Sequence, residues 1–487
     1  MVERRLSLAA LAAASLLLGC AGAPLLEDGH RPAMPADRPF EQVVGVTPTP
    51  PLVVERWWLV FEDAQLHEQI NTALAQNADL AVASARLRAA RAQLDQVSGA
   101  QWPRLDVEAT SGRSRVSADA STGTARLSTS HRALLTTDYE VDLWGRLASG
   151  TQAASQRLQA QSWARAAVEW SLTAQVAEAH FALRAVSRQL EIARAVQQGR
   201  THEVALRRAQ VSAGSGAVLE LRRAEAELAA AEATLANLSR RQLALQSALA
   251  LLTGRPLQAL VHDSGPAVQP LEPTRTFMVR LPEGALAELL ARRPDVRQAE
   301  AELLATKADV AVARASTLPA VWMTGSVGSD VRELSNLFSG PGFAWSLAAG
   351  VVHSLFDGGQ ARARVRESEA LSEAATARYQ RTVANAVVEV REAYLSVQVD
   401  ADVLRSEQQR VASLAQALQL ARIGQEAGVS TQLDTLDAQR NHFQAQLAEV
   451  DAYRARLVGQ VAAFKALGGG HALAAASLDE PNRKGAP

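Results

Sequence analysis

Two carboxylates and one guanidinium group follow one another at intervals of three residues near the C-terminal end of the chain. They belong to Asp434, Asp437 and Arg440. If this segment is helical, residues three apart lie on neighbouring surface, so Arg440 can pair with Asp437. The carboxylates would also place favourable charge near the start of a helix that follows Gly428. A solvated surface position is the other interpretation of Arg440.

No second group of residues suggests catalysis. The sequence has no Walker loop, no HExxH and no nucleophile elbow, and its nine histidines are scattered. We interpret His180 as a packing residue and the Gly-rich turn at 340–342 as structural. A net charge of −1 excludes a polybasic nucleic-acid binder. We therefore expect no enzyme, no metal site, no bound cofactor and no nucleic-acid partner.

The single cysteine, Cys20, is the residue for which we expect covalent chemistry. A basic start and an apolar stretch over residues 6–18 precede Gly19 and Cys20, which is the pattern of a signal peptide over residues 1–19. The stretch is too short to cross a bilayer as a helix. The alternative is an ordinary secretory signal in which Cys20 is incidental.

The residues around the cysteine are more specific. Leu17-Leu18-Gly19-Cys20 resembles the bacterial lipobox. This resemblance implies cleavage before Cys20, which would then carry an N-palmitoyl and an S-diacylglycerol group. Ala21 in place of Asp implies sorting to the outer membrane. Residues 20–56 are rich in Pro, Gly and Asp and are predicted to form an acylated N-terminal tether.

Long stretches without proline predict long helices. The sequence has no proline between Pro103 and Pro256, and none between Pro341 and Pro481. We expect helices over about 65–99, 146–212 and 218–252. A heptad seam predicts helix pairing in each half of the chain; it comprises Leu221, Ala224, Leu228, Ala231, Leu235, Leu238, Gln242, Leu245, Leu249 and Leu252, and later Leu436, Phe443, Val450, Leu457 and Phe464.

The two halves are copies of one unit at a spacing of about 214 residues. Asp79-Leu80 matches Asp295-Val296, and Ala213-Gly214 matches Ala427-Gly428. Each copy is predicted to contain a helix, two strands and two long helices. The predicted divisions are a first repeat over 57–254, a linker over 255–280, a second repeat over 281–470 and a flexible C-terminal tail over 471–487.

Alternating residues predict strands at about 103–116, 131–144, 319–332 and 343–355. After residue 20 no stretch has 18 consecutive apolar residues, so a membrane crossing would have to use strands. Segments of about ten alternating residues fit tilted membrane strands. A soluble sheet with one face packed on helices would show the same alternation. Tryptophans at 102, 144, 322 and 345, in or beside these segments, favour the membrane interpretation.

Four strands cannot close a barrel, so closure would need further chains. Two chains would supply 8 strands and three would supply 12, and both remain possible from these considerations.

Several motifs resemble those of the TolC-type outer-membrane efflux proteins, within their lipoprotein branch (OprM/NodT-like). The matching segments are Trp57-Trp58-Leu59-Val60-Phe61, Arg293-Pro294-Asp295-Val296, Leu355-Phe356-Asp357-Gly358-Gly359 and Leu436-Asp437-Ala438-Gln439-Arg440. The resemblance spans residues 57 to about 470. It implies a mainly α fold with a transmembrane β part, built as a trimeric 12-stranded β-barrel that continues into a long periplasmic α-helical barrel.

The same resemblance implies a function and partners. The chain would be the outer-membrane exit duct of a tripartite efflux system for drugs or other toxic small molecules. It would form a homotrimer in outer-membrane lipid, extend into the periplasm, and meet a periplasmic adaptor and an inner-membrane pump of the resistance-nodulation-division (RND) type. A type I secretion outlet for polypeptides and a periplasmic coiled-coil scaffold lipoprotein are the alternatives.

The resemblance also assigns roles to the helix-hairpin tips. Gly214, Gly216 and Gly428 would lie at the adaptor contact, although glycine at a helix end is first a conformational requirement. Around a three-fold axis Asp434, Asp437 and Arg440 would form rings at a periplasmic gate. The family's Arg-Tyr pair before the second tip is replaced here by Arg422-Ile423, so a tyrosine latch is not expected.

Overall fold

The computed structural model describes residues 56–116, 126–255, 271, 292–338 and 340–468. Cys20, the predicted signal peptide and tether, most of the predicted linker and the predicted tail lie outside the described residues. The chain divides into two compact units. Unit 1 contains Arg86–Ser162 and Gln298–Gln380, and unit 2 contains Trp163–Arg297 and Arg381–Pro487 together with the segment that ends at Ala85. Each unit therefore takes segments from both sequence repeats.

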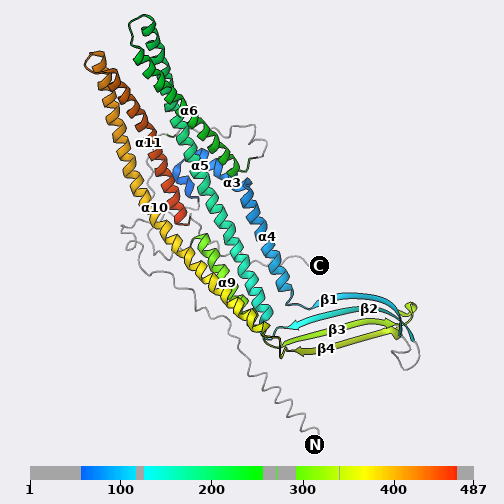
Figure 1. Ribbon diagram of the computed structural model, residues 1–487. Coiled ribbons are helices and arrows are strands. Elements are labelled where there is room, and N and C mark those ends of the chain that lie inside the picture. Colours follow the sequence, from blue (N-terminus) through cyan, green and yellow to red (C-terminus); the bar gives the residue numbers. More distant parts are fainter. Residues whose placement is uncertain (1–55, 117–125, 256–270, 272–291, 339, 469–487) are drawn as a thin grey trace. The chain divides into compact units, whose positions relative to one another are not determined.

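Long helices dominate the described residues, as the proline gaps predict (Figure 1). Their bounds are η1 (Trp57–Phe61), α3 (Ala64–Gln76), α4 (Ala78–Gly99), α5 (Arg146–Ser212), α6 (Val218–Leu252), α9 (Pro294–Ala315), η2 (Leu334–Asn336), η3 (Gly340–Gly342), α10 (Gln360–Glu426) and α11 (Gln432–Ala466). No helix in the described part of the chain is both long and apolar enough to cross a membrane.

The two repeats form helices of equal length. Helices α5 and α10 each have 67 residues, α6 and α11 each have 35, and α4 and α9 each have 22. At about 1.5 Å per residue, α5 and α10 are each on the order of 100 Å long. Equal lengths in matching order support the duplication that the sequence anchors indicate.

One helix prediction was wrong. The segment expected as a single helix over 65–99 is divided at Asn77 into α3 and α4. Asn77 has extended backbone angles, and its side-chain oxygen accepts a hydrogen bond from the Leu80 N–H at 3.1 Å, which caps α4. The same side chain donates to the Leu252 carbonyl at the end of α6, at 3.0 Å. Helix α4 thus begins where α6 ends.

The equivalent junction in the second repeat uses an arginine. Arg293 precedes α9, is 1% exposed, and donates to the Ala466 carbonyl at the end of α11, at 3.1 Å. Its guanidinium group also pairs with Asp295 at 2.7 Å and with Glu389 at 2.6 Å. It lies over the Trp170 ring, 5.2 Å from the ring centroid. Four elements of unit 2 therefore meet at this one side chain.

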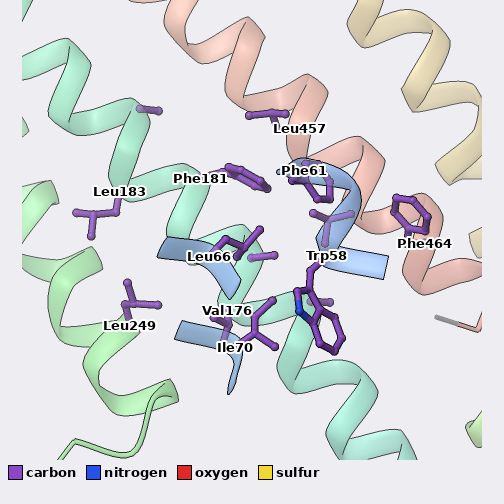
Figure 2. Close-up of a cluster of buried hydrophobic side chains, with 14 of the residues drawn as sticks. Trp58, Phe61, Leu66, Ile70, Val176, Phe181, Leu183, Leu249, Leu457 and Phe464 are labelled. Carbon is purple, nitrogen blue, oxygen red and sulfur yellow. The ribbon is translucent and has the colours of Figure 1, made fainter. Parts of the chain in front are cut away.

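The core of unit 2 gathers around η1 and α3. Trp57, Trp58 and Phe61 of η1 are buried, and Trp57 stacks on Phe464 of α11 with centroids 5.5 Å apart. Figure 2 shows this cluster, with Leu66 and Ile70 of α3 pointing among side chains of α5, α6 and α11. The aromatic segment Trp57–Phe61, for which the sequence analysis noted a family resemblance, is therefore a packing element.

The predicted heptad seams face the interior of the helix pairs. In α6 the seam residues Ala224, Ala231 and Leu249 are buried. In α11 the seam residues Leu436, Val450 and Leu457 are buried. The seven-residue repeat therefore identified the contact faces of both return helices.

Unit 1 contains one antiparallel sheet in the order β1-β2-β3-β4, whose strands lie side by side in Figure 1. The strands are β1 (Arg104–Val116), β2 (Arg126–Val141), β3 (Ala320–Val331) and β4 (Phe343–Val352). Strand β2 ends before the expected residue 144 because Asp142 already accepts a hydrogen bond from the Ala148 N–H in the first turn of α5, at 2.8 Å. Strand β4 likewise ends at Val352, before the expected 355.

The register places unlike residues on the two faces of this sheet. One row across all four strands consists of Val107, Leu135, Val327 and Trp345, and the next row on the opposite face contains Asp106, Thr136, Ser326 and Ser346. Arg132 and Asp330 pair on the polar face at 3.0 Å. On the apolar face Val107 is 82% exposed and Trp345 is 71% exposed. No part of the described chain covers these apolar side chains.

We predict that Asn77→Ala weakens the junction between α4 and α6. The variant loses the helix cap and leaves the Leu252 carbonyl without its donor, so the free energy of unfolding should fall by about 1–3 kcal/mol. The control is Asn237→Ala, on the exposed surface of α6. Denaturant unfolding followed by circular dichroism measures both. Equal stability of the two variants would contradict the role given to Asn77.

Candidate functional site

Both helix hairpins of unit 2 turn through the same backbone motif. At the first tip Gly214 has φ 74°, and the N–H groups of Gly214 and Ser215 donate to the carbonyls of Val211 and Gln210 at 3.0 Å. At the second tip Gly428 also has φ 74°, and Val429 donates to the Gly424 carbonyl at 2.9 Å. This left-handed helix end favours glycine because a Cβ atom would be strained there. The left-handed backbone conformation by itself therefore explains why glycine occupies positions 214 and 428.

Gly216 is required for a different reason, because its backbone lies close to Gln210 and leaves no room for a side chain. A Cβ atom on Gly216 would lie 2.8 Å from the Gln210 Cβ. In the second hairpin the matching pair is reversed, since Gly424 takes the place of Gln210 and Ser430 the place of Gly216. A Cβ atom on Gly424 would collide with the Ser430 Oγ. Each tip thus keeps one glycine in the pair, on opposite sides in the two repeats.

The carboxylate of Asp434 accepts hydrogen bonds at the start of its own helix, α11. Thr431 is the N-cap of α11 and forms a capping box with Asp434: the Thr431 N–H donates to the carboxylate at 2.8 Å, and the Thr431 hydroxyl lies 2.6 Å from it. These bonds from the Thr431 hydroxyl and N–H lower the pKa of Asp434 below its ordinary value. This geometry gives Asp434 a local structural role.

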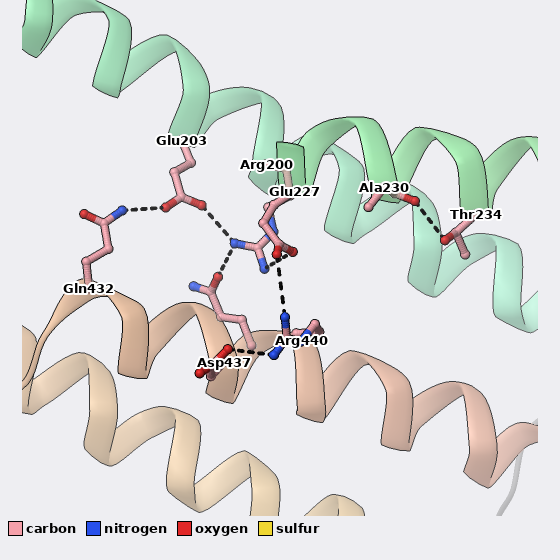
Figure 3. Close-up of polar contacts among 9 residues, drawn as sticks. Arg200, Glu203, Glu227, Ala230, Thr234, Gln432, Asp437 and Arg440 are labelled. Atoms are coloured by element: carbon pink, nitrogen blue, oxygen red, sulfur yellow. Dashed lines mark hydrogen bonds and ion pairs between the residues drawn. The ribbon is translucent and has the colours of Figure 1, made fainter. Parts of the chain in front are cut away.

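Asp437 and Arg440 form the pair that their spacing predicts. Their nearest side-chain atoms are 2.7 Å apart, and both side chains are about half exposed. Arg440 also approaches Glu227 of α6 at 4.0 Å. The pair on α11 is therefore joined to the first hairpin (Figure 3).

A buried arginine that the sequence analysis missed lies at the centre of these contacts. Arg200 of α5 is 6% exposed and donates to Glu203 at 3.0 Å and to the Gln439 side chain of α11 at 2.6 Å. Glu203 in turn accepts from Gln432 at 3.2 Å. Figure 3 shows this network between the two hairpins. The spacing of Arg200 and Glu203 is an i,i+3 signal, but such pairs are common on exposed helix surfaces, so it does not reveal burial.

His180 is buried, as its interpretation as a packing residue predicts, but it is also part of a polar network. Its Nε2 lies 3.0 Å from the Asp63 carboxylate and its Nδ1 lies 2.8 Å from the Gln69 side chain. Arg184 pairs with the same carboxylate. Burial lowers the pKa of His180. Burial alone would raise the pKa of Asp63, but the hydrogen bonds from His180 and the Leu66 N–H and the charge of Arg184 hold it well below its ordinary value.

No group of three or more His, Cys, Asp or Glu side chains that could hold a metal ion occurs among the described residues.

Known proteins match almost the whole described region. Residues 69–255 and 285–469 match the family model described as outer membrane efflux protein. The outer membrane protein OprJ of Pseudomonas aeruginosa is 33% identical over 468 residues, which cover 95% of each chain. The chain belongs to the outer membrane efflux protein family. The family predicted from the sequence motifs is thus confirmed, and with it a location in the outer membrane.

Two further matches agree with this membership. The cation efflux system protein CusC of Escherichia coli O157:H7 is 29% identical, over 93% of this chain and 96% of its own. The solved structure of the outer-membrane channel OprN has 31% identity and a TM-score of 0.79, covering 85% of this chain and 92% of that chain. The chain therefore has the fold of these efflux channels, and its relatives are channel proteins.

We predict that His180 makes the stability of the protein depend on pH. Because its folded pKa lies below the ordinary value of about 6.5, its contribution is complete above that pH and is lost as the pH falls toward the folded pKa. The loss is at most about 1.4 kcal/mol per pH unit for one proton. Asp63, with a lowered pKa, loses its contribution only below about pH 4, so the two effects separate.

The measurement compares the wild type with His180→Gln at pH 7 and pH 5 by denaturant unfolding. The stability difference between the two proteins should shrink at pH 5. His353→Gln, at an exposed position, is the control and should leave the pH profile unchanged. A difference that is constant or larger at pH 5 would refute the assignment.

Proposed function

We propose that this chain, acylated at Cys20, is the exit duct of a tripartite efflux system. Three copies would form a 12-stranded barrel in the outer membrane that continues into an α-helical barrel in the periplasm. The hairpin tips, with Gly214, Gly216 and Gly428, would meet a periplasmic adaptor and bring the duct to an inner-membrane RND pump. The duct would be passive and would carry out no catalysis.

The observation that carries this proposal is the uncovered apolar face of the sheet. Leu105, Leu347 and Val351 are each more than 60% exposed on that face. Contiguous apolar surface of this kind on a soluble protein would favour aggregation, whereas lipid would cover it. A scaffold protein whose sheet packs on its own helices would bury these side chains, so the face argues against the scaffold alternative.

The edges of the sheet support assembly from several copies. Strands β1 and β4 each have one neighbour in the described chain. Their unpaired backbone groups could not face lipid without a large free-energy cost. Pairing β4 of one copy with β1 of the next, in antiparallel order, would satisfy them and close the ring. The efflux family, with its trimeric ducts, favours three copies over two.

The relatives favour efflux over polypeptide secretion, since CusC is named for cation efflux. A gene neighbourhood with an adaptor and an RND pump would support this choice, and one with an exporter ATPase would favour the type I outlet. Within the duct, Asp437 and Arg440 are the gate candidates that we retain, because their pair links α11 to the first hairpin through Glu227. Asp434 is a weaker candidate because its carboxylate is engaged by Thr431.

We predict that Leu347→Arg prevents assembly in the membrane. A charge on the lipid-facing side of a barrel strand costs about 2–4 kcal/mol near the bilayer midplane. The neighbouring Ala348→Arg places the same side chain on the polar face and should assemble normally. Heat-resistant oligomers in detergent, after folding into lipid vesicles, measure both. Equal yields would contradict the assignment of the two faces.

We predict that Asp437→Asn enlarges the conductance of the purified channel in planar bilayers. Loss of the carboxylate releases Arg440 from its pair on α11 and, in the proposed trimer, removes a ring of three carboxylates from the gate. Asp434→Asn is the matched control, since its amide oxygen can still accept from the Thr431 N–H at the start of α11, and it should change the conductance little. Channels that are identical in all three proteins would leave the duct intact and rule out Asp437 as a gate residue.

A further inference from the structure

A cavity of about 640 Å³ opens between helices α5, α10 and α11 of unit 2. Its wall carries an excess of positive charge. Four arginines line it, Arg188, Arg200, Arg207 and Arg422, against two carboxylates, those of Glu191 and Glu203.

Both carboxylates are already neutralised. Arg188 pairs with Glu191 at 2.9 Å, and Arg200 pairs with Glu203 at 3.0 Å. The excess positive charge of the wall therefore belongs to the other two arginines.

Arg207 and Arg422 have no carboxylate partner among the described residues. Arg207 of α5 donates to the neutral side chain of Gln210 at 3.0 Å, and its Nε is buried without a hydrogen-bond partner in the described chain. Burial lowers the pKa of the His442 imidazole on α11, and the nearby charge of Arg422 on α10 lowers it further. Two cationic side chains without a carboxylate partner in the described chain, on the wall of one cavity, repel each other, which favours an anion between them.

The chemistry of the wall selects the ligand. Guanidinium groups present planar donor pairs that match carboxylate and phosphate oxygens, and they bind these anions more strongly than neutral acceptors. The cavity is larger than a single water molecule requires. Arg207 and Arg422 both line this cavity. Two guanidinium charges favour an anion with two charges over chloride.

We propose that this cavity binds a small dianionic oxyanion, of the phosphate or dicarboxylate class, between Arg207 and Arg422. Arg207 belongs to the first hairpin and Arg422 to the second, and each lies within two turns of its tip. A bound anion therefore ties the two hairpins together. This coupling rests on the proposed function only where conductance is the readout, since binding itself does not depend on it.

The first experiment is isothermal titration calorimetry of the full-length, acylated protein with inorganic phosphate, with chloride replaced at constant ionic strength. The wild type should bind saturably. Arg207→Gln and Arg422→Gln should each weaken binding on the order of tenfold or more, because a charge-assisted hydrogen bond is lost. Arg410→Gln, on α10 outside the cavity and paired with Glu407, is the matched control and should bind as the wild type does.

Three outcomes would overturn the site. They are the absence of saturable binding, binding that both cavity variants retain, and binding that the Arg410 control loses equally. Arg207→Lys keeps a charge without the planar donor pair and should bind with intermediate affinity, which guards against a variant that fails only because it misfolds. Repeating the titration with succinate distinguishes a dicarboxylate from a phosphate ligand.

The second experiment tests the coupling. Phosphate at constant ionic strength should reduce the conductance of wild-type channels in planar bilayers and leave Arg422→Gln channels unaffected. Intact binding with no change in conductance would overturn the coupling between hairpins. The absence of channels in every variant, with binding intact, would instead count against the proposed duct.

Discussion

Helices that end inside a bundle leave carbonyl groups without partners, and the architecture of unit 2 depends on how these groups are satisfied. The return helices α6 and α11 both end against the start of another helix. Asn77 donates to the Leu252 carbonyl in the first repeat, and Arg293 donates to the Ala466 carbonyl in the second. Asn77 directly precedes α4 and Arg293 directly precedes α9. Each of these side chains therefore joins the end of a return helix to the start of a different helix.

The two repeats meet the same geometric demands with different residues. An amide serves at one junction and a guanidinium at the other, and the larger group gathers Asp295, Glu389 and Trp170 around it. At the hairpin tips, the close pair is Gln210 with Gly216 in one copy and Gly424 with Ser430 in the other. In both cases the backbone path is kept while the side chains exchange roles, so the duplication is clearer in helix lengths than in residue identities.

The two hairpins contribute differently exposed side chains to the polar contacts near the tips. Arg200 is buried on α5 and reaches α11, while Asp437 and Arg440 lie half exposed on α11. A buried ion-pair network holds its geometry more firmly than an exposed pair, which solvent screens. The first hairpin thus supplies the buried part of the contact, and the second supplies the solvent-exposed part.

The sequence alone determined the long helices, the heptad seams, the repeat and the alternation of the strands, because each depends on residues near one another in the chain. It also indicated the family, through short motifs such as Arg293-Pro294-Asp295-Val296.

The sequence did not reveal the break at Asn77, the central position of Arg200, or the capping of α11 by Asp434 and Thr431 in place of a free carboxylate. The break and the position of Arg200 depend on partners more than 170 residues away, Leu252 and Gln439. The capping box is local, but the same residues also fit an exposed helix face, and only the backbone angles at Thr431 decide between the two. The tertiary structure decided the break at Asn77 and the position of Arg200 because burial and hydrogen bonding between distant segments leave no periodic pattern in the sequence.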